Sequence, residues 1–451
     1  MKLLALPQGA RFTNKQIMVF LLPIFFEQLM VAGLNIADTF MVSFFGDDYV
    51  AGVALVSRID TFAKSFFLAL AQGGSVVMSQ YIGAKDSKKA QLSMKNNIRI
   101  VTLIGIMLML VMVIFRPQIL NLLYGKADKS ILEVSNSYFT VTALSYPFVA
   151  LYYANSSSFR AMGESKIPSM FSIVMMVTNL VLKYIFLFVA DMGIKGAALS
   201  TLISMALTGI AMLVILYSKK NHVPLSGLFK PDFKKKSIFQ ILRISLPNGI
   251  ENGMFQLGAL LIAGLVSSLG TTAIAADQQA RTLSPLIHSM GTSFTAVMLM
   301  LIGQCMGAGR PDEARMYKNH ILKLDYIITF INVVIFFIVL KPINSLFGVS
   351  DAVKETAADI LALYASCSVF FYPTSFALAG ALRGTGDTKF VMTVSMTSMF
   401  VFRIGAAYFF AKGLNMGIMG AWLAMVSDWA IRSVVFSIRF KRGKWAQNKV
   451  I

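Results

Sequence analysis

Two acidic residues, Glu27 and Asp38, stand inside the first long apolar stretch of the chain, which runs from residue 17 to 44. A stretch of this length can cross a bilayer as a helix. A carboxyl group costs roughly 2.5–3.5 kcal/mol to insert there, so an acid at such a place is typical of a site that binds a proton or a cation. Eleven residues, about three helical turns, separate the two acids, so both side chains project from one face of the helix.

Glu251 is a third acid of this kind, and it repeats the first. The sequence LPIFFE, which holds Pro23 and Glu27, returns in the second half of the chain as LPNGIE, which holds Pro247 and Glu251. In a structural interpretation, each glutamate hydrogen-bonds polar or backbone groups beside its proline, where the helix lacks a donor. In a functional interpretation, each binds a proton, because burial favours the neutral carboxyl. Both remain open for Glu27, and we prefer the functional one for Glu251.

Asp38 differs from these glutamates because Ile262 occupies the corresponding position of the second repeat. An acid present in only one of two repeats is what a coupling site would look like, in which Asp38 would alternate between a proton and Lys183. A fixed salt bridge between Asp38 and Lys183 is the alternative. Further along the chain, Asp277 and Arg281, and likewise Asp428 and Arg432, are spaced to form ion pairs along single helices. These four residues are predicted ion pairs that could also line a substrate cavity.

Four other residues have less local support in the sequence. Arg403 has no partner close in sequence and is predicted to face a cavity, to which Tyr372 could add an aromatic surface. Asp60 and Arg58 point to different faces of their helix and are expected to need partners from elsewhere. We predict no catalytic residue and no metal site.

The composition indicates a membrane protein. The chain has 451 residues, of which 56% are hydrophobic and 14% charged, whereas soluble domains have about 25% charged residues. We predict an all-α polytopic membrane protein with twelve transmembrane spans. These are residues 17–44, 50–79, 93–115, 132–158, 167–190, 194–217, 239–269, 273–303, 321–340, 355–382, 390–411 and 415–438.

The formal charge of +20 is explained by topology. Lys and Arg concentrate in alternate short loops, which is the pattern of cytoplasmic loops and predicts that both termini are cytoplasmic. No nucleic-acid-reading element accompanies the charge, so nucleic acid is not a predicted partner. No Walker, HExxH or nucleophile-elbow motif is present, which argues against an ATP-driven pump and against an enzyme.

Four sequence blocks occur twice. Besides the glutamate block, QYIGAKDSKKA returns as QCMGAGRPDEA, FRAMGESK as LRGTGDTK and MGIKGAA as MGIMGAW, and the offset along the chain is almost constant. This duplication predicts two six-helix lobes, 1–217 and 239–451, joined by a basic cytoplasmic linker, 218–238. Because six is an even number of spans, the lobes should be related by a pseudo-twofold axis along the membrane normal.

The paired blocks resemble the multidrug and toxic compound extrusion (MATE) family over essentially the whole chain. The resemblance implies a two-lobed antiporter that exports amphipathic, often cationic compounds in exchange for Na⁺ or H⁺. It also implies that Asp38, in LNIADTFMVSFFG, and Asn179 belong to a cation or proton site in the N-terminal lobe. The chain departs from the sodium-binding pattern at Lys183, where that pattern has an aspartate. An ammonium group repels Na⁺, so we expect coupling to H⁺ in preference to Na⁺.

Together these observations predict a multi-pass exporter of the bacterial cytoplasmic (inner) membrane that works as a monomer by alternating access. Its partners would be small amphipathic substrates and the lipid bilayer, with no cofactor besides the coupling ion. A flippase for a lipid-linked saccharide is the alternative, because intramembrane arginines would suit an anionic pyrophosphate. A membrane receptor or scaffold would explain the spans but not a duplicated core with buried carboxylates.

Overall fold

The computed structural model describes residues 11–44, 47–124, 129–218, 221–228, 235–345, 349–448 and 450–451. These residues form helices joined by short turns, and they contain no β-strand. In chain order the helices are α1 (Asn14–Ser43), α2 (Asp47–Gly83), α3 (Ser87–Ile114), α4 (Arg116–Tyr124), α5 (Lys129–Leu144), α6 (Tyr146–Ala161), α7 (Lys166–Tyr184), η2 (Ile185–Val189), α8 (Gly193–Leu216), α9 (Lys235–Ser267), α10 (Thr271–Gly307), α11 (Pro311–Ser345), α12 (Asp351–Tyr372), η3 (Pro373–Ala377), α13 (Leu378–Gly384), α14 (Thr388–Ser398), η4 (Met399–Gly405), α15 (Ala406–Tyr408), η5 (Phe409–Gly413), α16 (Gly417–Lys441) and η6 (Lys444–Gln447).

The predicted all-α, twelve-span fold class is confirmed, because each predicted span coincides with one helix or with a run of consecutive helices. The span predicted at 132–158 is divided into α5 and α6 at Ser145, two residues before a proline that cannot continue the hydrogen-bond ladder. Helix α11 begins ten residues before its predicted span, and the short α4 was not predicted. Among the described residues, eight helices are long and apolar enough to span a membrane, or nine if the bent α10 counts as one span.

Three helical runs contain four π-helical turns, namely η2, η3, η4 and η5. One of them has an evident cause, since Pro373 opens η3 and lacks the N–H that an α-helix would use. Lys183 lies just before η2, Tyr372 just before η3, and Arg403 inside η4. Three predicted site residues therefore lie at local irregularities, which are frequent near functional sites.

The helices form two compact units whose boundaries fall inside α1 and α9. The N-terminal unit is Phe26–Gly249, and the C-terminal unit is Ile250–Ile451 together with the start of the chain up to Phe25. Each boundary lies two residues after a proline inside the helix, Pro23 in α1 and Pro247 in α9. The predicted lobes, 1–217 and 239–451, follow the sequence repeats and not these contacts, and they stay a prediction.

Helix α1 opens the first repeat, but its first part belongs to the C-terminal unit. Helix α9 opens the second repeat, but its first part belongs to the N-terminal unit. In the C-terminal unit, Ile17, Phe20 and Leu21 of α1 belong to a buried apolar cluster with residues of α10, α11 and α13. In the N-terminal unit, the Oγ of Ser245 in α9 donates a hydrogen bond to the Leu70 carbonyl, 2.8 Å away. Gly73 permits this contact, because a Cβ there would lie about 2.4 Å from the Ser245 backbone.

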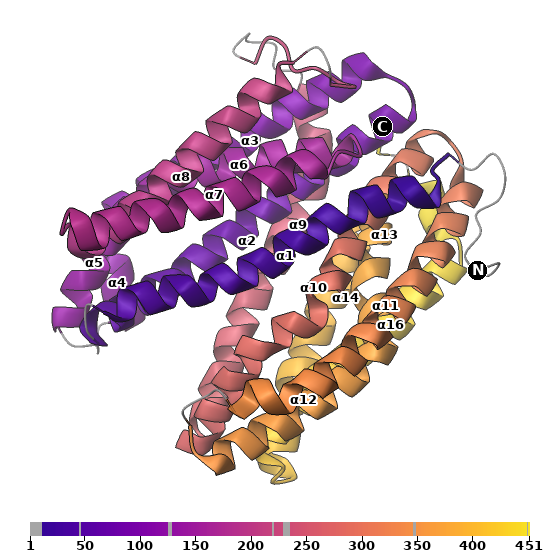
Figure 1. Ribbon diagram of the computed structural model, residues 1–451. Helices are drawn as coiled ribbons and strands as arrows, with labels where there is room; N and C mark the ends of the chain where they lie inside the picture. The colour runs from indigo at the N-terminus through magenta and orange to yellow at the C-terminus, as the bar shows by residue number, and fades with distance from the viewer. Residues whose placement is uncertain are drawn as a thin grey trace. The chain divides into compact units, whose positions relative to one another are not determined.

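Within each unit the helices pack side by side in a bundle (Figure 1). In the N-terminal unit α2 packs against α3, α5 and α6, and α8 packs against α5, α6 and α7. In the C-terminal unit α10 packs against α11, α12 and α13, and α16 packs against α12 and the π-helical turns η3, η4 and η5. Helices α10 and α16 each carry one of the helical ion pairs discussed below, Asp277–Arg281 and Asp428–Arg432.

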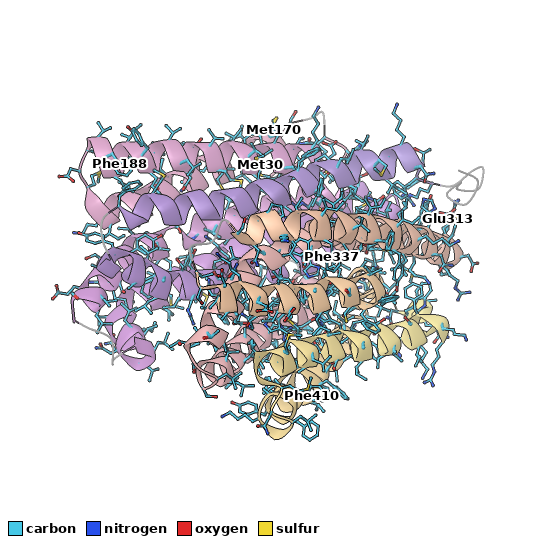
Figure 2. The ribbon with its side chains drawn as sticks, turned by 60° about the horizontal axis from the view of Figure 1, so that its bottom comes forward. Met30, Met170, Phe188, Glu313, Phe337 and Phe410 are labelled. Atoms are coloured by element: carbon cyan, nitrogen blue, oxygen red, sulfur yellow. The ribbon has the colours of Figure 1, made fainter. Side chains whose placement is uncertain are left out.

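The outward faces of these helices carry large apolar side chains. Figure 2 labels four that extend from the ribbons, Met30, Met170, Phe188 and Phe337, and each is 42–51% exposed. Continuous apolar faces of this kind would associate in water, whereas acyl chains cover them in a bilayer.

Candidate functional site

Glu27 forms an ion pair with Arg160 inside the N-terminal unit. A guanidinium nitrogen of Arg160 donates to both carboxylate oxygens, at 3.0 and 2.8 Å. The Ser169 hydroxyl donates a third hydrogen bond, also 2.8 Å long. Glu27 is only 6% exposed, so these three hydrogen bonds offset the cost of burying its charge.

Glu251 forms the corresponding ion pair with Arg383 in the C-terminal unit. The Arg383 guanidinium lies 2.7 Å from Oε1 of Glu251, whose side chain is 4% exposed. The other oxygen, Oε2, is buried and has no hydrogen-bond partner in the described part of the chain. The repeat has therefore preserved the ion pair but not the serine that completes it around Glu27.

The proposed local bonding of these glutamates beside their prolines is wrong. Both glutamates bind arginines that are distant in the sequence, at the ends of α6 and α13. The sequence contained a signal for this pairing, since Arg160 recurs as Arg383 at nearly the same offset at which Glu27 recurs as Glu251. Two residue types that recur together in both repeats are candidates for one contact.

Asp428 is the centre of a charged cluster in the C-terminal unit. It is fully buried on α16, and its Oδ2 lies 2.9 Å from Arg432 and 3.9 Å from Arg403 in η4. The Ser398 hydroxyl donates to Oδ1 at 2.6 Å. The Arg432 guanidinium also lies over the Phe376 ring, 4.9 Å from its centroid. The structure thus contains the Asp428–Arg432 pair and extends it to Arg403.

Asp277 and Arg281 form the second helical ion pair, with 2.7 Å between Oδ2 and Nε. The indole N–H of Trp422 donates to the other oxygen of Asp277 at 2.9 Å. Both charged residues line a small cavity with Arg403 and Trp422. The other lining residues are Ile262, Ala421 and Met425. This cavity brings together three of the residues that the sequence predicted for a substrate cavity.

Tyr372 lies beside this cluster in an aromatic group. Its ring stacks on His288 at a centroid separation of 4.1 Å and on Phe376 at 4.4 Å. Trp429 meets these rings edge-on, 5.7 Å from Tyr372. Because Tyr372 is buried, it serves here as a packing residue of the cluster.

The predicted cation site of the N-terminal unit is described only in part. The side chain of Asp38 lies outside the described residues, although its backbone belongs to α1. The Asn179 amide on α7 donates to the hydroxyls of Thr201 and Ser204 on α8, at 3.1 and 3.2 Å. Lys183, one turn further along α7, is buried and 3% exposed. The roles assigned to Asp38, Asn179 and Lys183 remain predictions.

Asp60 of α2 pairs with Lys64 on its own helix at 2.6 Å. The expectation that Asp60 needs a partner from elsewhere is therefore wrong.

Asp325 of α11 lies within the predicted span 321–340 but was not singled out from the sequence. It is fully buried on α11, and its one hydrogen bond in the described structure comes from the Thr329 hydroxyl, 3.1 Å away.

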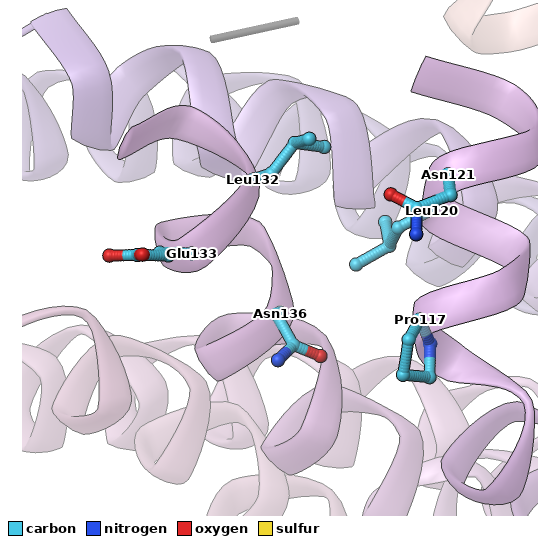
Figure 3. A pocket seen from close by; sticks show the side chains of 6 residues that line it. All are labelled: Pro117, Leu120, Asn121, Leu132, Glu133 and Asn136. Atoms are coloured by element: carbon cyan, nitrogen blue, oxygen red, sulfur yellow. The ribbon is translucent and has the colours of Figure 1, made fainter. Parts of the chain in front are cut away.

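A pocket of about 240 Å³ lies apart from these residues, between α4 and α5 of the N-terminal unit (Figure 3). Pro117, Leu120 and Asn121 line it from α4, and Leu132, Glu133 and Asn136 from α5. The Glu133 carboxylate points away from α4 in Figure 3. None of the predicted site residues lines this pocket.

Comparison with known proteins identifies the family. The model of the MatE family matches residues 23–185 and again 247–409, two segments separated by the same offset as Glu27 and Glu251, as the duplication predicts. A relative from Thermotoga maritima, "Probable multidrug resistance protein NorM", is 22% identical over 97% of this chain and 94% of its own length.

Solved structures share the fold. One, described as "Reverse polarity of binding pocket suggests different function of a MOP superfamily transporter" from Pyrococcus furiosus, has a TM-score of 0.89 at 18% identity, over 96% of this chain and 97% of that one. A second, the "outward-facing conformation of a multidrug resistance MATE family transporter", has a TM-score of 0.87 at 19% identity over the same shares. The family resemblance of the motifs is confirmed, and the chain is a multi-pass membrane transporter of the MatE family.

Proposed function

We propose that this transporter is a secondary active multidrug exporter that exchanges amphipathic, cationic compounds for H⁺ by alternating access. The observation that carries the proposal is the MatE match in both halves of the chain. The names of relatives such as the NorM protein of Thermotoga maritima support it. The exporter would lie in the bacterial inner membrane with both termini in the cytoplasm, and it would work as a monomer.

A proton gradient supplies enough energy for such export. One charge that moves down about 100 mV releases about 2.3 kcal/mol, which supports roughly a 40-fold substrate gradient at about 1.4 kcal/mol per tenfold. Lys183 supports H⁺ over Na⁺, because it is buried one helical turn from Asn179. A fixed ammonium there raises the energy of a second cation nearby.

Dye efflux from proteoliposomes tests this proposal. Vesicles with the purified protein would be loaded with ethidium, and a pH gradient or a Na⁺ gradient would be imposed separately. We expect uphill efflux with the pH gradient alone, and loss of that efflux in Asp38→Asn. Asp359→Asn, a change at an exposed aspartate on α12, is the control and should transport as the wild type does.

The variant Lys183→Asn tests whether Lys183 determines that H⁺ and not Na⁺ is the coupling ion. If Lys183 is what excludes Na⁺, this variant should respond to a Na⁺ gradient that leaves the wild type inactive. Efflux by the wild type with Na⁺ alone would contradict proton coupling. Efflux with neither gradient would contradict the multidrug exporter itself.

A flippase for a lipid-linked saccharide is the second candidate, and one observation favours it. Arg281 and Arg403 line the same small cavity in the C-terminal unit, and Asp277 is the one acid among its lining residues. A surplus of guanidinium groups suits a pyrophosphate better than a cation. Transbilayer movement of a fluorescent polyprenyl-pyrophosphate saccharide, without dye efflux, would favour this function.

A further inference from the structure

Helix α11 carries a polar stripe inside the C-terminal unit. Asp325, Thr329 and Asn332 are spaced by four and three residues, so their side chains leave one face of the helix. Asp325 is fully buried and Thr329 is 3% exposed. The Asn332 amide donates to the carbonyls of Leu286 and Ile287 on α10, at 3.0 and 2.8 Å.

These carbonyls lie beside a bend of α10. The axis turns by 47° between the segments Thr271–His288 and Gly291–Gly307, and Pro285 removes one N–H from the ladder just before the bend. The polar stripe of α11 therefore lies against a helix whose backbone is already interrupted. A change in that bend would alter what surrounds the stripe.

Asp325 differs from the other buried acids whose side chains the structure describes, because none of the ion pairs found there includes it. Glu27, Glu251, Asp277 and Asp428 each lie 2.7–2.9 Å from an arginine. Asp325 accepts a single hydrogen bond, from Thr329 to its Oδ1 at 3.1 Å. Its Oδ2 is buried and has no partner among the described residues.

Within the described ranges of the chain, the elements packed against α11 offer no free cation to Asp325. The main elements are α10, α12, α13 and η3, and η3 carries no ionisable side chain. The part of α1 in this unit also packs near α11, and its one ionisable side chain, Lys15, is exposed. Arg281 of α10 is paired with Asp277, Arg383 of α13 with Glu251, and Lys354 of α12 with Asp351. The remaining ionisable groups on α10 and α12 are His288, Cys305, Glu355, Asp359, Tyr364, Cys367 and Tyr372.

Of these groups, Tyr372 lies within electrostatic reach of Asp325, and a phenol contributes no positive charge. His288 stacks on the ring of Tyr372 and hydrogen-bonds the Tyr364 hydroxyl. On α11 itself, Lys323 is two residues away from Asp325, which places it on another face of the helix. The surroundings of the Asp325 carboxyl are thus neutral.

A bare carboxylate in such surroundings is costly. Burial of an ionised carboxyl without a cation costs several kcal/mol or more, whereas the protonated acid is neutral and becomes a hydrogen-bond donor. We propose that Asp325 is a proton-binding carboxyl of the C-terminal unit, protonated in this conformation and ionised when water reaches the polar stripe. The proton comes from water on one side of the membrane and returns to water on the other, so charge and atoms balance.

This inference rests on the proposed H⁺-coupled export and adds a coupling residue to it. Val101 occupies the position of the first repeat that corresponds to Asp325, so this proton site belongs to one repeat only. Protonation of Asp325 would stabilise the closed packing of α11 against α10, and loss of the proton would favour a hydrated one. Substrate binding and proton release could then be coupled through the α10 bend.

Infrared spectroscopy of the purified full-length protein in lipid nanodiscs tests the protonation directly. Near neutral pH we expect a carbonyl band from a protonated, buried carboxylic acid, which shifts in D₂O. The band should be lost in Asp325→Asn and retained in Asp359→Asn. Asparagine has nearly the shape of the protonated acid, so this variant should fold. A spectrum unchanged by Asp325→Asn would overturn the inference.

Ethidium efflux driven by a pH gradient tests the coupling role. Asp325→Asn should bind ethidium with the wild-type affinity but lose uphill efflux, because it cannot release a proton. Wild-type efflux and proton stoichiometry in this variant would also overturn the inference. If the wild type shows no gradient-driven efflux, the proposed function fails, and the infrared band still decides whether Asp325 holds a proton.

Discussion

One contact occurs in both repeats with different chemistry. In the N-terminal unit Asn179 on α7 bonds Ser204 on α8. At the corresponding positions of the second repeat, Arg403 in η4 lies 3.9 Å from Asp428 on α16. The C-terminal unit adds Arg432 at the position that corresponds to Thr208. The same scaffold contact is thus neutral in one unit and ionic in the other, so the fold fixes the geometry and the side chains decide the charge.

The Glu27–Arg160 and Glu251–Arg383 pairs show the opposite behaviour, since both repeats keep the ionic chemistry. Each glutamate lies four residues after the proline at which α1 or α9 passes from one unit to the other. Both repeats therefore keep an arginine on the glutamate close to this passage, and the proton-binding interpretation of Glu27 and Glu251 stays a prediction. The Asn179 and Arg403 positions, which differ, are better candidates for specialised function.

The largest effect should follow from the loss of Asp428. Asp428→Ala leaves Arg403 and Arg432 buried without their carboxylate, which should lower the free energy of unfolding by about 3–5 kcal/mol. The corresponding change in the other unit, Ser204→Ala, removes two neutral hydrogen bonds, one from Asn179 and one to the Thr201 carbonyl, and should cost about 1–2 kcal/mol. Calorimetry of the two variants in detergent measures both.

Asp428→Leu combined with Arg432→Met is the control for the first prediction. A double variant without the buried pair should recover much of the lost stability. If Asp428→Ala and Ser204→Ala lowered the free energy of unfolding equally, the ionic contact would contribute no more stability than the neutral one.

Removal of the arginines in the two Glu–Arg pairs should give effects of similar size. Arg160→Ala and Arg383→Ala each leave a buried glutamate without its cation, at a cost of about 3–5 kcal/mol. Arg383→Ala should cost roughly 1 kcal/mol more, because Glu27 keeps the Ser169 hydrogen bond and Glu251 has no such donor in the described structure. Thermal unfolding of both variants measures the difference, and adding Ser169→Ala to Arg160→Ala should abolish it.

Substitution of Asn179 should destabilise the protein more than substitution of Arg403, although Arg403 is the charged residue. Asn179→Ala removes hydrogen bonds to Thr201 and Ser204, at about 1–2 kcal/mol. Arg403→Met should cost less than about 1 kcal/mol, because Asp428 keeps Arg432 and Ser398 and the repulsion between two guanidinium groups is removed. A larger loss of thermal stability in Arg403→Met would mean that Arg403 is part of the structural ion pair.

Another small effect concerns a turn in which the two repeats carry opposite charges. Asp86 accepts from the backbone N–H of Lys89 and pairs with its ammonium, both at 3.0 Å, whereas Arg310 and Glu313 occupy the corresponding positions with 2.7 Å between them. The Lys89 backbone N–H, followed by its side chain, holds the pKa of Asp86 below its ordinary value. Asp86→Ala should cost about 1 kcal/mol near neutral pH, as other helix N-caps do.

The sign of the pH dependence follows from the lowered pKa. The Asp86 contribution is complete above the pKa of the unfolded carboxyl, about 3.9, and is lost as pH falls through the lower pKa of the folded state. The melting temperatures of the wild type and Asp86→Ala should therefore converge in acid. Arg310→Ala is the corresponding variant in the other repeat. If the difference in melting temperature between the wild type and Asp86→Ala stayed constant as pH falls, the charge of Asp86 would have no role.

Much of the fold could be predicted from the sequence. Long apolar stretches specify spanning helices because every backbone group in a membrane must be bonded within its own helix. The repeat of LPIFFE as LPNGIE revealed the duplication. Irregular backbone was harder to predict: the division at Ser145 and the π-helical turns depend on local packing as well as on prolines.

The candidate site was predicted unevenly. The pairs Asp277–Arg281 and Asp428–Arg432 follow from helical spacing alone, and the structure contains both. The partners of Glu27 and Glu251 were missed because spacing reports only neighbours on one helix. Asp325 was overlooked because its meaning lies in the neutrality of its surroundings, which belong to other helices.

The sequence by itself determined that the protein is a duplicated, twelve-span membrane transporter, because hydropathy, loop charge and repeats are properties of short stretches of chain. The tertiary structure decided which buried acid meets which base. Such a pairing depends on side chains brought together from helices far apart in the sequence, as for Glu27 with Arg160 and Glu251 with Arg383. It also distinguished Asp325, because the neutrality around a carboxyl can be recognised only when the neighbouring helices are in place.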